Sequence, residues 1–148
     1  MKLSRFTVTL LSLAILIFSC KSSNKIKPED DYNLALMQIE KLHLLYNEEN
    51  FEEIVDTLYS SGLVKIGNKN EIIESLKYKF QRFGKVIDSK ISNEYGTALT
   101  PNTQRREVTI TAKTQFENKL CPEVFVFFVD DEVKLALHRV KDYPSKSK

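Results

Sequence analysis

The sequence predicts an α+β domain, in which about three helices come first and pack on a curved antiparallel sheet of about four strands. Two observations predict this class. From Asp30 to Phe83 the apolar residues recur every three or four positions, which is the spacing of one helix face. After Gly84 they recur at every second position, as in a half-buried strand. Helices that precede strands, instead of alternating with them, favour a segregated fold.

A long helix is expected to open the domain. Asp30 or Asp31 can cap it, and it is predicted to run to about Glu48. Its apolar stripe consists of Ala35, Ile39, Leu42 and Tyr46. His43 lies at the border of this stripe, and we interpret it as a solvated or hydrogen-bonded residue, with a role as a ligand as the alternative.

Two shorter helices and one short strand are predicted next. Residues 51–59 are expected to form a short helix, and residues 63–66 a short strand. Asn68 and Glu71 have the spacing of a capping box, so a further helix is expected to start there. Gly84 is expected to close this helix. Its predicted buried residues are Ile72, Ile73, Leu76, Phe80 and Phe83.

Four strands are expected after Gly84. Residues 87–95 form the first, residues 96–102 a loop, and residues 108–116 a long half-buried strand. The predicted inward face of that strand contains no ionisable residue and consists of Val108, Ile110, Ala112, Thr114 and Phe116. Residues 124–129 are apolar on both faces and should form a central strand, and residues 133–140 the last one. His138 alternates with Leu137 in that last strand, so the pattern allows it to face either side.

The N-terminus predicts an anchor. Lys2 and Arg5 precede an apolar run of signal-peptide length, which is short for a membrane-spanning helix. The run ends in Ile17-Phe18-Ser19-Cys20, which resembles the lipobox of bacterial lipoproteins. The resemblance implies that the Cys20 thiol receives diacylglycerol, that the chain is cut before Cys20, and that the new amino group is acylated, for example with palmitate. A plain secretory signal or an uncleaved anchor helix is the alternative.

These features divide the chain into four parts. Residues 1–19 are predicted as a signal peptide, 20–28 as the lipidated cysteine and a flexible polar spacer, 29–143 as one domain, and 144–148 as a disordered tail. The anchor places the protein at a bacterial membrane in the cell envelope. By resemblance to enterobacterial sorting, a residue other than Asp after Cys20 favours the outer membrane, facing the periplasm or the cell surface.

Charge and cysteine content exclude some functions. Removing Lys2 and Arg5 leaves 22 − 2 = 20 basic residues against 20 acidic ones, so no strong basic field favours nucleic-acid binding. With Cys20 lipidated, Cys121 has no disulfide partner and is expected to be a buried small hydrophobe, not a nucleophile.

The order of elements resembles the nuclear-transport-factor-2-like cone, also called cystatin-like, over about residues 30–143. The residues that carry the resemblance are YNEENFEEIV at 46–55, FQRFGK at 80–85 and FFVDDEVKL at 127–135. A cystatin-type inhibitor, the nearest competitor, has too few helices and a glutamine-valine-glycine loop that is absent here. The resemblance implies a pocket between sheet and helices, whose candidate lining residues are Tyr46, Phe80, Phe83, Ile110, Phe116 and His138.

Two functions fit this sequence. The first is a non-catalytic binding or assembly module on a lipid tether, with no catalytic residue, metal or cofactor. The alternative is a small-pocket enzyme of the ketosteroid-isomerase or polyketide-cyclase type, which needs a carboxylate or histidine with a raised pKa. A closed apolar interior favours the first. A buried carboxylate, or His138 open to a cavity, favours the second.

Self-association is also expected, because helices can cover only one face of the sheet. Phe125, Phe127 and Val129 occupy one face of the third strand, and they are the candidate interface with a second copy or a protein partner. Val124, Val126 and Phe128 occupy the other face. Coverage of the open face by residues 96–102 and the C-terminal residues is the alternative.

Overall fold

The structure is a computed structural model that describes residues 28–99 and 106–142. In this part of the chain the helices are α2 (Pro28–Asn47), α3 (Phe51–Thr57), α4 (Ser61–Gly67) and α5 (Lys69–Phe83). The strands are β1 (Val86–Leu99), β2 (Arg106–Phe116), β3 (Leu120–Val129) and β4 (Val133–Val140). The predicted α+β class is confirmed. The signal peptide 1–19, Cys20, most of the spacer 20–28 and the tail 144–148 lie outside the described residues.

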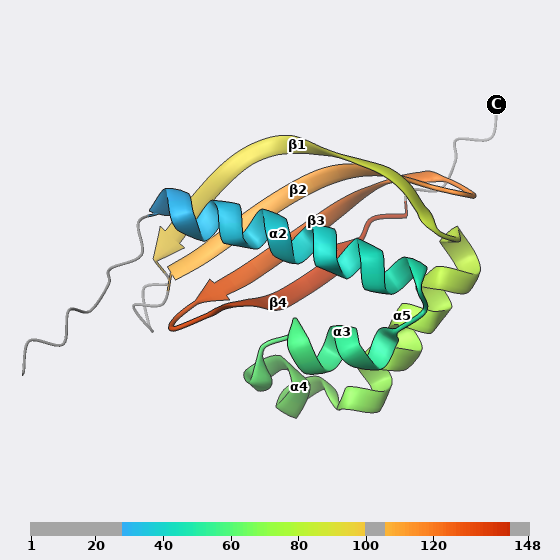
Figure 1. The fold of residues 1–148 in the computed structure, drawn as a ribbon, viewed down its shortest axis with the longest axis horizontal. Helices are drawn as coiled ribbons and strands as arrows, with labels where there is room; N and C mark the ends of the chain where they lie inside the picture. Colours follow the sequence, from blue (N-terminus) through green and yellow to red (C-terminus); the bar gives the residue numbers. More distant parts are fainter. Residues whose placement is uncertain (1–27, 100–105, 143–148) are drawn as a thin grey trace, which may run out of the picture.

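The strands form one antiparallel sheet in the order β1-β2-β3-β4, so each strand pairs with the next along the chain (Figure 1). Register shifts interrupt the β1–β2 pairing between Val86 and Asp88, between Ile91 and Asn93, and between Asn93 and Gly96. Such bulges bend a strand and increase its twist, which accounts for the bent course of β1 (Figure 1). A further register shift interrupts the β3–β4 pairing between Val126 and Phe127.

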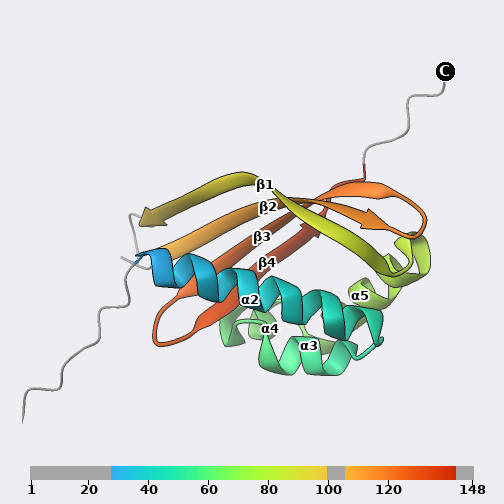
Figure 2. The same ribbon diagram turned by 45° about the horizontal axis from the view of Figure 1, so that its top comes forward.

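The helices pack on one side of the sheet. Figure 2 shows α2 lying along the sheet, with α3, α4 and α5 on the same side. The Asn47 side chain fixes the end of α2 to the start of β1, because it donates to the Val86 carbonyl at 2.9 Å and accepts from the Val86 N–H at 2.8 Å. Arg106 at the start of β2 forms an ion pair of 2.9 Å with the buried Asp31 of α2. Both ends of α2 are thus attached to the sheet.

The core forms between α2, α3, α5 and the inner face of the sheet. Tyr46 packs edge-on against Phe51, Phe80 and Phe116, and Phe83 packs on Phe116 with ring centroids 5.5 Å apart. Of the residues predicted to be buried in the last helix, Ile73, Leu76 and Phe83 are buried, whereas Ile72 and Phe80 are only partly buried. Cys121 is buried, as expected.

The short strand predicted for residues 63–66 is wrong, because this segment belongs to α4. Ser60 starts the helix, since its Oγ accepts a hydrogen bond of 3.3 Å from the Leu63 N–H. Leu63 and Val64 face the core, whereas Ile66 is exposed. The loop predicted from Gly96 also starts too early, because β1 continues to Leu99, which pairs with Arg106.

The helix boundary at Gly84 follows the sequence. Gly84 has a φ angle of 76°, which lies in the left-handed region that favours glycine. A Cβ atom there would lie 2.8 Å from the Cβ atom of Glu117, so space and backbone both favour glycine.

None of the helices in the described residues is long and apolar enough to cross a membrane.

Candidate functional site

A buried carboxylate lies at the centre of the domain. Glu123 belongs to β3, on the inner face that Phe125 and Phe127 also occupy, and only 1% of its surface is exposed. Its position on this face follows from the strand, because side chains two residues apart point to the same side of a sheet. A buried charge needs partners, because transfer from water to an apolar interior is costly for an ionised group.

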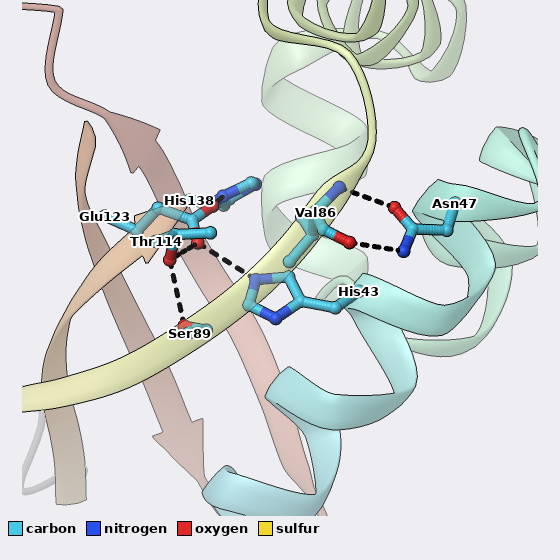
Figure 3. Close-up of polar contacts among 7 residues, drawn as sticks. All are labelled: His43, Asn47, Val86, Ser89, Thr114, Glu123 and His138. Carbon is cyan, nitrogen blue, oxygen red and sulfur yellow. Dashed lines mark hydrogen bonds and ion pairs between the residues drawn. The ribbon is translucent and has the colours of Figure 1, made fainter. Parts of the chain in front are cut away.

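Two histidines supply those partners from different elements (Figure 3). His43 of α2 places Nε2 2.9 Å from Glu123 Oε2, and His138 of β4 places Nε2 2.7 Å from Oε1. Both rings also contact Phe125: His138 stacks on it with ring centroids 5.0 Å apart, and His43 meets it edge-on at 5.9 Å. Glu123 of β3 is therefore linked to α2 through His43 and to β4 through His138.

Two hydroxyl groups complete the site. Thr114 of β2 donates its hydroxyl to Glu123 Oε2 at 2.5 Å. Because this uses the only hydroxyl proton of Thr114, Ser89 of β1 donates to Thr114 Oγ1 at 2.9 Å (Figure 3). The chain of polar contacts from His43, Glu123 and His138 through Thr114 to Ser89 is called the glutamate cluster below. It contacts every strand of the sheet.

The hydrogen bonds fix which groups are charged. Burial raises the pKa of Glu123, but hydrogen bonds from His138 and His43 outweigh burial, so the pKa lies well below its ordinary value of 4.5. Burial and the nearby Lys79 lower the pKa of His138, although Glu123 opposes this shift. His138 Nδ1 is buried and has no hydrogen-bond partner among the described residues. A neutral ring with its proton on Nε2 satisfies this geometry, because an imidazolium would bury a second N–H without an acceptor.

The interior around the cluster is closed. The space bounded by Leu42, Tyr46, Phe116 and the cluster has no room for a water molecule. The Tyr46 hydroxyl is buried there without a hydrogen-bond partner in the described part of the chain, and burial followed by the charge of Glu123 raises its pKa. Both Glu123 oxygens already accept hydrogen bonds. The cluster therefore ties α2 to the sheet, with both Glu123 oxygens occupied and His138 Nδ1 buried without a hydrogen-bond partner among the described residues.

Of the sequence-predicted pocket residues, Tyr46, Phe116 and His138 line this filled space, whereas Phe80, Phe83 and Ile110 do not. Phe83 and Ile110 are buried elsewhere in the core, and Phe80 is partly buried with its ring against Tyr46. Sequence reasoning missed Glu123 and gave His43 only a border position. Strand alternation is the signal that identifies Glu123, because it lies two residues before Phe125 and therefore on the same face of the strand.

The candidate interface on Phe125, Phe127 and Val129 is wrong. All three side chains are buried beneath the helices, with exposures of 0%, 1% and 3%. The inner face is fixed by register, since Phe125 pairs with the fully buried Ile110 of β2. The outward set is therefore Val124, Val126 and Phe128, whose side chains are partly buried.

The described residues contain no group of three or more histidine, cysteine, aspartate or glutamate side chains arranged to hold a metal ion. Comparison of the chain with models of protein families, with curated proteins and with solved structures gives no match.

Proposed function

We propose that this protein is a lipid-anchored protein of the bacterial cell envelope whose domain acts as a non-catalytic binding module. The observation that carries the non-catalytic part is the closed interior, in which both oxygens of Glu123 are occupied and no water-sized space remains. General acid–base chemistry needs a group within hydrogen-bond reach of the reacting proton. The order of helices and strands supports a nuclear-transport-factor-2-like arrangement in which the usual pocket is filled by side chains.

The tether is supported by the sequence of residues 1–20. Basic residues, an apolar core, Ser19 and Cys20 occur in the order of a lipoprotein signal. One acyl chain gives only marginal membrane binding, whereas two or more hold a protein stably. The outer membrane, with the domain facing the periplasm or the cell surface, is the proposed location. The polar residues 21–28 would separate the domain from the lipid surface.

Replacement of Cys20 by serine tests the anchor. The variant is expected to accumulate as an uncleaved precursor, because the lipid-bearing thiol is the substrate of the processing step. Intact-mass spectrometry of the membrane fraction should show wild-type protein that begins at Cys20 and carries acyl mass. Cys121→Ser is the matched control and should be processed normally. A wild-type protein that begins at another residue without acyl mass would contradict the anchor.

The outer face of the sheet is the proposed surface for a second copy of the chain. Val124, Val126 and Phe128 form an apolar row on it, and no helix of the described residues covers this side (Figure 2). Light scattering on residues 20–148 carrying Cys20→Ser is expected to give the mass of a dimer, and Val126→Lys to give a monomer. A wild-type monomer at high micromolar concentration would remove the case for self-pairing and leave only a different protein partner.

The enzyme alternative is favoured by the buried carboxylate of Glu123, which is one of the two features expected of such a pocket, although the space beside it is filled. Glu123 and His138 lie side by side among aromatic rings, an environment of the kind that shifts pKa values at active sites. The shift goes the wrong way for a carboxylic acid, because the pKa of Glu123 is lowered and not raised. We therefore place this function second.

A further inference from the structure

A groove opens on the far side of His138 from the glutamate cluster. Its volume is about 230 Å³, and it runs between α4, α5 and β4. His138 lines both this groove and the closed interior, so this residue lies between the two spaces. The apolar walls of the groove are Leu63, Ile72, Leu76 and Leu137.

One cation lies in this groove with little to neutralise it. Lys79 of α5 is half-buried, and its Nζ donates a hydrogen bond of 3.4 Å to the His138 carbonyl. Lys79 takes part in none of the ion pairs among the described residues. Burial lowers the pKa of Lys79, while the charge of Glu123 opposes that shift. The Glu123 oxygens are occupied by the histidines and Thr114, so they do not contact the ammonium.

We propose that this groove binds a small monocarboxylate with an unbranched apolar chain, whose carboxylate contacts Lys79. This inference rests on the proposed function, because it gives the binding module a ligand class. The volume is below the usual range of about 300–1,000 Å³ for drug-sized ligands, so a short chain fits better than a large one. An ion pair formed in a partly desolvated groove is stronger than one in water.

The other end of the groove sets the preference for a single carboxylate. Glu71, Ser75 and Lys79 lie on one face of α5 at four-residue spacing, and all three line the groove. Eight residues of helix separate Glu71 from Lys79, which is about 12 Å along the axis. A second carboxylate on the ligand would approach Glu71, and like charges repel. The groove therefore selects against dicarboxylates.

Two larger hollows on the surface lack this combination. The first contains Asp56, Lys65, Glu132 and Lys134, and the second contains Asp130, Asp131, Glu132 and Lys134. Their charges are compensated locally: Lys134 pairs with Glu132 at 2.9 Å, and Asp56 pairs with Lys69 at 2.6 Å. Lys65 of the first hollow forms none of the ion pairs among the described residues, but it is exposed, so its ammonium keeps its contact with water, unlike the half-buried Lys79.

Octanoate, octanedioate and octylamine are the probes that test this site. They are titrated into residues 20–148 carrying Cys20→Ser, with binding followed by NMR shifts of backbone amides. Octanoate is expected to saturate and to shift amides near Leu76, Lys79 and Leu137. Octanedioate should bind several-fold more weakly, and octylamine should also bind more weakly than octanoate, because the one carboxylate in the groove, Glu71, is exposed to water. Shifts confined to the outer sheet face, or equal binding of octylamine, would overturn the proposal, as would no saturation at millimolar octanoate.

Three variants separate the role of Lys79 from general damage. Lys79→Met should weaken octanoate binding about tenfold or more, because a hydrogen bond between charged groups is lost. Lys77→Met is the matched control, since Lys77 is exposed, pairs with Glu74 and should leave binding within about twofold.

If Lys79→Met fails to fold, Ser75→Phe decides, because it fills the groove from an exposed position and should abolish binding. Unchanged affinity in the folded Lys79→Met protein, or in Ser75→Phe, contradicts the site. Failure of octanoate to bind would leave the acyl anchor and the sheet interface standing, because mass spectrometry and light scattering test those separately.

Discussion

Replacement of Glu123 by alanine is expected to lower the free energy of unfolding by about 3–5 kcal/mol, the range found when one partner of a buried pair is removed. The change leaves three donors, from His43, His138 and Thr114, without their common acceptor. Domains of this size have about 5–15 kcal/mol in total, so the variant should be marginally stable. Urea denaturation followed by circular dichroism measures the loss.

Glu132→Ala is the control for this variant. Glu132 is exposed and pairs with Lys134 at 2.9 Å on the surface, so its removal should cost less than about 1 kcal/mol. Equal losses for the two variants would mean that the Glu123 contacts contribute no more than a surface ion pair. Glu123→Gln is informative as well, because it keeps the shape of the side chain but loses the charge.

The pH dependence of stability provides a second readout of the same cluster. The pKa of Glu123 is depressed in the folded protein, so its contribution is present above the ordinary value of 4.5 and is lost as pH falls below it. The pKa of His138 is also depressed, so below its ordinary value of 6.5 the unfolded chain takes up the proton first. Both groups make wild-type protein less stable in acid. The Glu123→Ala variant should show a flatter profile below pH 4.5, and an equally steep loss would assign acid sensitivity to other carboxylates.

Much of the fold was predictable because periodicity is a local property. The change of period at Gly84 separates helices from strands, and the structure places the boundary there. The prediction for segment 63–66 failed because a four-residue segment with three apolar residues, two of them β-branched, fits a strand or one turn of helix equally well. What decides between them is the Ser60 cap together with the packing of Leu63 and Val64, and only the latter depends on the tertiary fold.

The candidate site was less accessible from the sequence. β3 was expected to start at Val124, so Glu123 was left outside the strand, although its parity with Phe125 places it inside. A carboxylate at that position is tolerated only if donors reach it, and His43 lies 80 positions away in the chain. The inner and outer faces of β3 were assigned the wrong way round, because both alternating sets of side chains are apolar and the sequence does not distinguish them. Pairing with Ile110 of β2 resolves the face, and that register is a long-range property.

Replacement of Phe116 by alanine is expected to cost about 3–5 kcal/mol, as for other fully buried aromatic residues. Phe116 is 1% exposed and ends β2, where its ring meets Tyr46 of α2 and Phe83 of α5. Truncation therefore creates a new cavity where two helices meet the sheet, because the interior beside Phe116 is already filled by side chains.

The matched control is Phe128→Ala on the neighbouring strand. Phe128 lies on the outer face and is only partly buried, so less apolar surface returns to water when it is truncated. Thermal and urea unfolding should give Phe128→Ala less than half the loss of Phe116→Ala. The comparison is made at low protein concentration, because a dimer through the outer face would add to the cost of Phe128→Ala as concentration rises. Equal losses in the dilute monomer would contradict the assignment of the inner and outer faces of the sheet.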